Sequence, residues 1–120
     1  MRTLLLALSL FLMSPPDVTG PPPSIRAITD GVWVEFPKGA VDICIYFVSK
    51  TETIERDGEQ VPYGPSHCWL NDDENLEGID DNWSFIEPNG SEWDVYALIY
   101  YDVPGEKPIE LSTNHILLVH

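Results

Sequence analysis

Tryptophan and carboxylate side chains stand close together in the middle of this sequence. Asp80 and Asp81 come shortly before Trp83, and Trp69 follows Cys68. A tryptophan ring presents a flat, amphipathic face on which a sugar ring can stack, and carboxylates beside it can accept hydrogen bonds from sugar hydroxyls. We therefore identify Trp83, Asp80, Asp81 and Trp69 as candidate carbohydrate-binding residues.

Further aromatic side chains are expected on exposed faces. The chain contains four Trp and five Tyr, which is more than a small core needs. Strand alternation places Trp33 opposite Val32 and Val34, and it places Tyr96 and Tyr100 on the polar side of their strand. Exposed Tyr and Trp rings form platforms that bind sugars or act as hot spots for a protein partner. The alternative is that most of these rings cover the core.

A dense acidic segment lies directly before Trp83. Six carboxylates fall between Asp72 and Asp81, and oxygen ligands at this density are the type that calcium prefers. The spacing does not fit an EF-hand, because Ser84 occupies the position of the closing glutamate. From the residues alone, a looser calcium loop and a solvated acidic loop are both open interpretations.

Catalytic chemistry has little support in the sequence. The histidines are His67, His115 and His120, and no G-x-S-x-G nucleophile motif is present. A zinc site needs three or four ligands, and the two cysteines are better suited to pairing with each other. We therefore expect a protein that is not an enzyme and that uses no cofactor and no metal.

The charge balance narrows the class of partner. The chain has 120 residues, with 20 Asp and Glu against 6 Lys and Arg, which gives a net charge of −14. Nucleic acids and anionic membrane surfaces attract Lys and Arg, so this chain is unsuited to both. A neutral polysaccharide or a basic secreted protein is compatible with the charge.

The N-terminus has the pattern of a secretory signal peptide. Arg2 precedes an apolar run at residues 4–13, and polar, proline-containing residues 14–17 follow. The run is too short to span a membrane, and no later segment is long enough to do so. We expect a signal peptide at residues 1–20 and a single secreted, extracellular domain at residues 21–120.

If the protein is secreted, its cysteines and its N-x-S triplets become informative. Cys44 and Cys68 are the only cysteines, and an even number in an oxidising compartment favours a disulfide over the alternative of two buried thiols. Asn82 and Asn89 each begin an N-x-S triplet, the acceptor pattern for N-glycosylation. We expect one disulfide and a glycoprotein, with Asn89 in a turn as the better acceptor.

Short strands are expected along residues 21–120. Apolar and polar residues alternate, Pro and Gly recur at turn spacing, and no segment carries the apolar stripe of a helix. The predicted strands are residues 32–36, 41–48, 83–86, 93–101, 109–111 and 115–119. This pattern is typical of an all-β protein with an antiparallel, immunoglobulin-like β-sandwich.

Residues 51–81 depart from this pattern. They are rich in Gly, Pro and acidic residues and poor in apolar ones. Either the segment contains strands that the alternation does not reveal, or it is a long loop that is held at Cys68 in an irregular stretch. Long loops on a rigid sheet scaffold often carry function.

The order of the strand motifs resembles a known family. The motifs are P-S-I-R-A-I at 23–28, G-V-W-V-E-F-P at 31–37, I-C-I-Y-F at 43–47, N-W-S-F at 82–85 and D-V-Y at 94–96. In this order they resemble the N-terminal glucan-binding module, a carbohydrate-binding module, of insect β-1,3-glucan recognition proteins. These proteins are also called Gram-negative bacteria-binding proteins, and the resemblance spans roughly residues 23–119.

The resemblance implies an immunoglobulin-like sandwich that binds β-1,3-glucan without hydrolysing it and serves pattern recognition in innate immunity. It implies glucan contacts at Trp83 and at Asp80 and Asp81. The chain departs from the family pattern at Asn82, where arginine is expected, and at Trp93, where glycine is expected. The cysteine pair and the acidic segment also lie outside that pattern.

Two other functions are compatible with the residues. The first is a secreted immunoglobulin- or fibronectin-like domain that binds a basic protein through its acidic loop. The second is a calcium-dependent, lectin-like adhesion domain.

Overall fold

The computed structural model describes residues 20–82 and 91–119, and these residues form ten strands. Every strand pairing is antiparallel, so the predicted all-β, antiparallel class is confirmed. The predicted signal peptide apart from Gly20, the predicted strand at 83–86, Trp83 and Asn89 lie outside the described residues. Within the described ranges, no helix has the length and apolar character needed to cross a membrane.

A three-stranded sheet is formed by the first two strands and the seventh, in the order β1-β2-β7. These strands are Ser24–Ile28, Gly31–Glu35 and Gly78–Asn82. The predicted alternation holds in β2, because Val32 and Val34 are fully buried while Trp33 lies on the opposite face and is half-buried. We call this three-stranded unit the small sheet.

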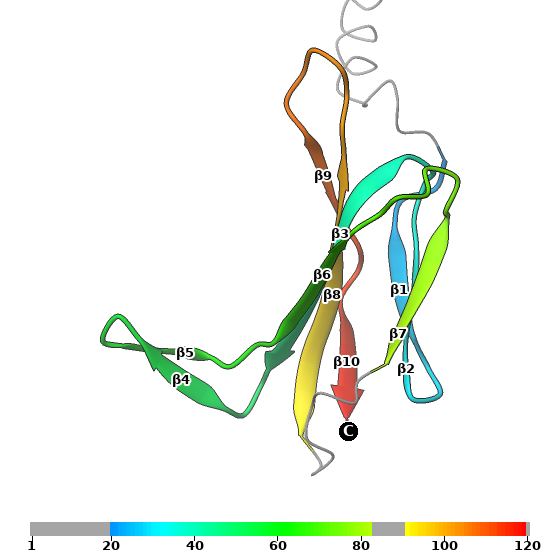
Figure 1. Cartoon of the computed structure of the whole chain (residues 1–120). Helices are drawn as coiled ribbons and strands as arrows, with labels where there is room; N and C mark the ends of the chain where they lie inside the picture. Colours follow the sequence, from blue (N-terminus) through cyan, green and yellow to red (C-terminus); the bar gives the residue numbers. More distant parts are fainter. Residues whose placement is uncertain (1–19, 83–90, 120) are drawn as a thin grey trace, which may run out of the picture.

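A five-stranded sheet packs against the small sheet, with the order β10-β8-β3-β6 and with β9 also paired to β8 (Figure 1). Its strands are β3 Ala40–Ser49, β6 Ser66–Leu70, β8 Glu92–Tyr101, β9 Ile109–Ser112 and β10 Ile116–Val119. The two long central strands, β3 and β8, correspond to the two longest predicted strands. We call this unit the large sheet.

The core lies between the two sheets and is built from alternate residues of each strand. The small sheet contributes Ile25, Val32 and Val34, and the large sheet contributes Ile43, Ile45, Phe47, Trp93, Val95, Ala97, Ile99, Tyr101 and Leu118. Burial of these β-branched and aromatic side chains is the main favourable term in folding. The faces of the two sheets that point away from this core carry the polar and aromatic residues discussed below.

Residues 51–81 contain four strands, so the expectation of a long loop is wrong and that of hidden strands is confirmed. Strands β4 Thr53–Arg56 and β5 Glu59–Pro62 form a hairpin that projects away from both sheets (Figure 1). Its turn is Asp57-Gly58, and both residues have positive φ, 53° and 82°, as a tight hairpin turn requires. Strand β6 then pairs into the large sheet, and strand β7 pairs into the small sheet.

The predicted disulfide between Cys44 and Cys68 is present. The placement of Cys68 in an irregular stretch is wrong, because Cys68 lies in β6 and pairs directly with Cys44 of β3 across the ladder. The two Cα atoms are 4.1 Å apart, because the two cysteines lie directly opposite each other on neighbouring strands. The disulfide therefore fastens the edge strand β6 to the centre of the large sheet.

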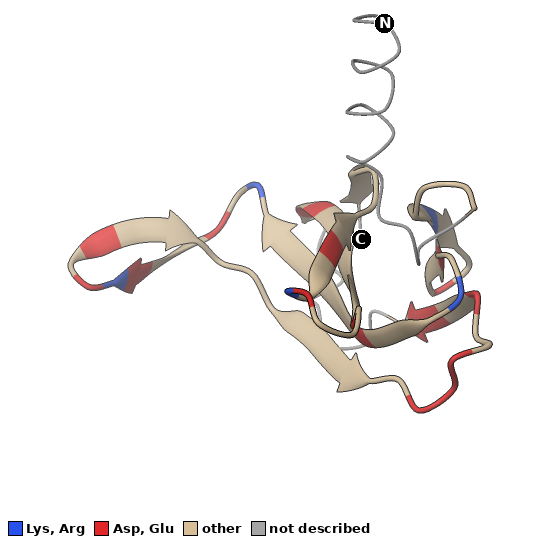
Figure 2. Cartoon of the chain, turned by 90° about the horizontal axis from the view of Figure 1, so that it is seen from above, with Lys and Arg blue, Asp and Glu red and all other residues tan. Residues whose placement is uncertain are grey.

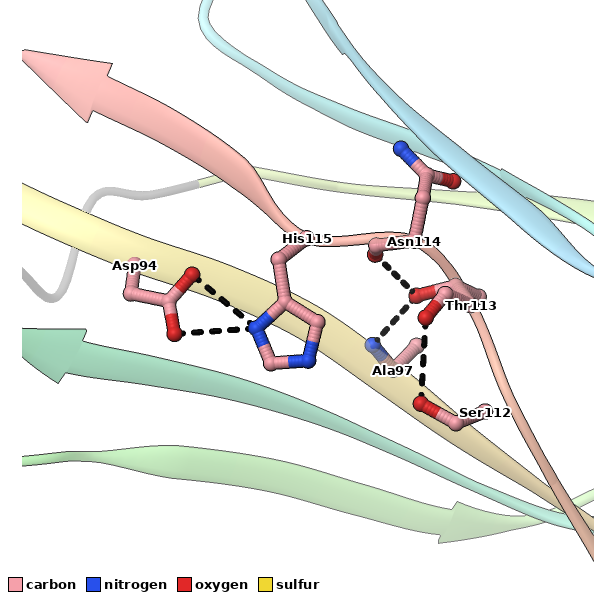
Figure 3. Close-up of polar contacts among 6 residues, drawn as sticks. All are labelled: Asp94, Ala97, Ser112, Thr113, Asn114 and His115. Atoms are coloured by element: carbon pink, nitrogen blue, oxygen red, sulfur yellow. Dashed lines mark hydrogen bonds and ion pairs between the residues drawn. The ribbon is translucent and has the colours of Figure 1, made fainter.

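A β-bulge separates β9 from β10. Ser112 pairs with Leu98 and Ile116 pairs with Val95, so three residues of the β9–β10 connection face two residues of β8. Thr113 fills the break: its backbone N–H donates to Ala97 O at 3.0 Å, and its Oγ1 accepts the Ala97 N–H at 2.9 Å. The threonine hydroxyl thus takes the place of a ladder carbonyl (Figure 3).

The extra residue of the bulge, Asn114, connects the two sheets. Its Oδ1 accepts the Ile25 N–H at 2.9 Å, and its Nδ2 donates to Ile25 O at 3.1 Å. The side-chain amide therefore pairs with one residue of β1 as a neighbouring strand would. This contact ties the free edge of the small sheet to the edge of the large sheet.

Replacing Asn114 with alanine removes both hydrogen bonds to Ile25. We expect Asn114→Ala to lower the free energy of unfolding by about 2 kcal/mol, since each bond contributes about 1 kcal/mol. Urea denaturation of the variant checks this. Asn75→Ala is the matched control, because the Asn75 side chain is exposed in the acidic segment, and it should change stability by less than about 0.5 kcal/mol. Equal effects of the two substitutions would contradict the assignment.

The double substitution Cys44→Ala with Cys68→Ala removes the disulfide, whose cysteines are 24 residues apart in sequence. We expect the free energy of unfolding to fall by about 3 kcal/mol, because the closed loop no longer restricts the unfolded chain. Denaturation of the oxidised wild type, the reduced wild type and the double variant measures this loss. A stability that does not differ among the three proteins would count against it.

Candidate carbohydrate-binding groove

A groove of about 510 Å³ lies where the edge of the small sheet meets the edge of the large sheet. We call it the tryptophan groove, and it is lined by Trp33, His67, Trp69, Leu76, Gly78, Ile79, Asp80 and Asp81. Three residues identified from the sequence, Trp69, Asp80 and Asp81, therefore come together here. Trp83, the fourth, lies outside the described residues.

Trp33 lies on the outer face of the small sheet and is held there by close packing. Its ring rests on Gly78 of the neighbouring strand β7, where a Cβ would come within 2.4 Å of Trp33 Cζ2. Its Nε1–H donates to Glu35 Oε1 at 2.9 Å. Only glycine leaves room for this approach, so the ring is held close to β7 while Trp33 stays half-buried.

Trp33 also lines a second hollow of about 530 Å³. This hollow is bounded by Pro21 and Pro22 of the N-terminal lead-in, and Gly78 lines both hollows. The surface around the ring is therefore extended rather than a closed pocket. An extended aromatic surface suits a chain-like ligand better than a small compact one.

Trp69 and His67 approach the groove from the large sheet. Both lie in β6 opposite core residues of β3, since Trp69 pairs with Ile43 and His67 with Ile45. Their rings have centroids 4.6 Å apart at an interplanar angle of 49°. Trp69 is half-buried, so part of its ring is available at the groove surface.

A histidine–aspartate hydrogen bond closes this edge between the sheets. His67 Nδ1 lies 2.8 Å from Asp81 Oδ2, and the Asp81 side chain is 10% exposed whereas His67 is 51% exposed. The next residue toward the N-terminus, Asp80, points to the opposite face of β7 and is exposed beside Trp33, its partner in the ladder. The two adjacent carboxylates therefore have different roles, Asp81 in holding β6 to β7 and Asp80 as an open hydrogen-bond acceptor.

The acidic segment between β6 and β7 is an ordered connection. Asn71 Nδ2 donates to Ala40 O at 2.7 Å, and Gly39 N donates to Glu74 O at 2.9 Å. Asp73 Oδ1 accepts the Asn75 N–H at 3.0 Å, as in an Asx turn. Figure 2 shows acidic positions on this connection and on the projecting hairpin.

The carboxylates of this segment point into solvent. Across residues 20–82 and 91–119, no group of three or more His, Cys, Asp or Glu side chains is arranged to hold a metal ion.

A second aromatic surface covers the outer face of the large sheet. Tyr46 of β3 and Tyr96 of β8 stack with centroids 5.2 Å apart, and His115 stacks on Tyr96 at 4.3 Å. His115 Nδ1 lies 2.9 Å from Asp94 Oδ2 (Figure 3). Tyr100 lies on the same face, and we call this surface the tyrosine face.

Tyr96 and Tyr100 of this face stay protonated at physiological pH. Burial, together with the charges of Glu110 and Tyr46 and the hydrogen bonds to them, raises the pKa of Tyr100 to about 12. Burial, with smaller effects of Tyr46, Asp94 and Glu110, also raises the pKa of Tyr96. The hydroxyls therefore keep their protons and remain hydrogen-bond donors.

The structure describes one of the two predicted glycosylation acceptors. Asn82 is exposed at the end of β7, where an attached glycan would stand near the groove, whereas Asn89 lies outside the described residues.

Trp33 was expected on an exposed face but was not included among the ligand-binding residues. Its alternation with the buried Val32 and Val34 was the signal that could have identified it, together with the spacing to Gly78 once β7 is recognised.

Comparison with known proteins provides no relative: no protein-family model, curated protein or solved structure matches this chain. The groove is therefore interpreted from its own geometry.

A methyl group at position 78 should displace the Trp33 ring. We expect Gly78→Ala to shift the Trp33 indole N–H resonance and to lower stability by about 1 kcal/mol, because a Cβ at this point overlaps the ring. Gly58→Ala, in the open turn of the hairpin, should leave that resonance in place. An unchanged indole signal in Gly78→Ala would show that the ring does not rest on β7.

Proposed function

We propose that this chain is a secreted, non-catalytic carbohydrate-binding module that recognises polysaccharides of the β-1,3-glucan type in innate immune pattern recognition. The observation that supports this most strongly is the tryptophan groove, in which Trp33, Trp69 and the exposed Asp80 lie on one open surface. Flat rings can stack on successive sugars, and a carboxylate beside them can bind sugar hydroxyls.

The breadth of the groove supports a polymer as the ligand. Trp33 and Gly78 line both hollows, so a polysaccharide could cross the outer face of the small sheet from the proline lead-in to β6. A neutral polysaccharide is also compatible with the net charge of −14. The resemblance of the strand motifs to the glucan-binding module of β-1,3-glucan recognition proteins supports the same class of ligand.

The proposal includes an immunoglobulin-like β-sandwich as the fold and secretion as the route. The two antiparallel sheets with a shared apolar core support the sandwich. The Cys44–Cys68 disulfide supports an oxidising compartment, as does the signal-peptide pattern at residues 1–20. The departures from the family motifs concern the sugar-contacting residues more than the strands, so the class of glucan is proposed.

Retention on an insoluble glucan tests the proposal. The full chain, secreted from eukaryotic cells, should be retained on curdlan and released by soluble laminarin. Trp33→Ala and Trp69→Ala should each weaken laminarin binding by about fivefold or more, since loss of a contacting aromatic residue costs more than about 1 kcal/mol. Isothermal titration calorimetry measures this change.

The control is Leu117→Ala, an exposed apolar residue on β10, on the opposite side of the molecule from the groove. It should bind laminarin as the wild type does. Failure of the wild type to bind curdlan or laminarin would refute the proposal. Wild-type affinity in both tryptophan variants would refute the assignment to the groove.

A further inference from the structure

The tyrosine face is the side of the large sheet that no other part of the described chain covers. The small sheet packs on the opposite face, where the core lies. The uncovered face carries Tyr46, Tyr96, Tyr100 and His115 at its centre, with the carboxylates Asp94 and Glu110 beside them. It is separate from the tryptophan groove, because His67 and Trp69 point to the core side of β6 whereas this face lies on the other side.

The aromatic stack has an open end. It runs from His115 through Tyr96 to Tyr46, and the cross-strand neighbour of Tyr46 on β6 is Ser66, a small and exposed residue. A ring beside serine has space next to it for a planar or compact group. The faces of tyrosine rings attract cations, and guanidinium groups in particular stack on them.

The charged groups around the stack are carboxylates that can bind a cation. Glu110 is exposed, and Asp42, which pairs with Tyr100 across the ladder, is half-buried. Among the described residues, Lys38 forms an ion pair with Glu77, and this pair lies away from the tyrosine face. Asp94 holds His115 and Glu110 accepts a hydrogen bond from the Tyr100 hydroxyl, but a carboxylate has several acceptor positions, so the exposed Glu110 can also bind an external cation.

The rim of the face is apolar. Leu70, at the end of β6, is 77% exposed and Leu117, on β10, is 58% exposed. Their ladder partners are Asp42 and Asp94, so both leucines point to the same side as the tyrosines. Exposed apolar side chains around an aromatic centre are typical of a protein-binding surface.

We propose that the tyrosine face docks a basic segment of another secreted protein, with an arginine side chain beside Tyr46 and a second cation near Glu110. The guanidinium stacks on the open face of the ring and donates to the carboxylates, while Leu70 and Leu117 contact apolar side chains of the same segment. A polypeptide uses all three features of the face, namely rings, charge and apolar rim. A neutral sugar would leave the carboxylates without a cationic partner.

Binding of a short arginine-rich peptide to the full chain tests the proposal, with a glutamate-rich peptide of the same length as the comparison. Fluorescence anisotropy should detect the arginine peptide alone, and the affinity should fall as salt is raised. Tyr46→Leu should weaken binding about two- to fivefold, whereas Tyr46→Phe, which keeps the ring, should bind nearly as the wild type does.

A charge-matched pair of variants separates docking from general attraction. Glu110→Gln removes one charge on the face and should weaken binding about two- to fivefold. Glu59→Gln removes one charge on the projecting hairpin and should leave binding unchanged. Equal losses in the two variants would overturn the proposal, because they would mean that net charge alone attracts the peptide.

Three further results would also overturn it. The first is absence of any binding to the arginine peptide. The second is equal affinity of Tyr46→Leu and the wild type while thermal denaturation shows both to be folded. The third is loss of peptide binding in Trp69→Ala, which would place the peptide in the groove. Laminarin binding that persists in Tyr46→Leu would show that the two surfaces act separately.

Discussion

The bulge opposite β8, with Asn114 as its extra residue, is the constraint on which the arrangement of both sheets depends. A strand that slips by one residue turns every following side chain to the other face, so the insertion at Asn114 decides what lies on each side of β10. With it, Ile116 and Leu118 return to the core side and His115 stands on the outer face against Tyr96. Thr113 makes the insertion tolerable by satisfying Ala97 N, and Asn114 is freed to bind β1.

The two edges between the sheets are closed in different ways. At one edge a neutral amide, Asn114, pairs with Ile25 through two hydrogen bonds. At the other edge a hydrogen bond joins His67 to Asp81, and the side chains there are wide enough apart to leave the tryptophan groove. Edge strands are exposed to unwanted pairing, and this protein covers one edge with the bulge while it fastens the other with the disulfide and the His67–Asp81 hydrogen bond.

The sequence predicted the buried half of this structure and missed the exposed half, for a physical reason. Strands β2, β3 and β8 have one face in the core, so burial imposes the alternation by which they were recognised. Strands β4 to β7 bury little, and their pairing depends on a turn, a disulfide and cross-strand contacts that leave no periodic pattern. Trp69, Asp80 and Asp81 were grouped from chemistry alone and line one groove, whereas the proximity of Trp33 required the pairing of β2 with β7.

A histidine–aspartate pair organises each of the two aromatic surfaces. His67 contacts Trp69 and Asp81 at the groove, and His115 contacts Tyr96 and Asp94 on the tyrosine face. In each case one carboxylate is used to orient an imidazole against an aromatic ring. The carboxylates that remain, Asp80 at the groove and Glu110 on the tyrosine face, therefore determine the chemistry of each surface. The extended surface of the groove offers stacking positions for successive sugars beside Asp80, whereas the exposed leucines of the tyrosine face add apolar contacts for a polypeptide beside Glu110.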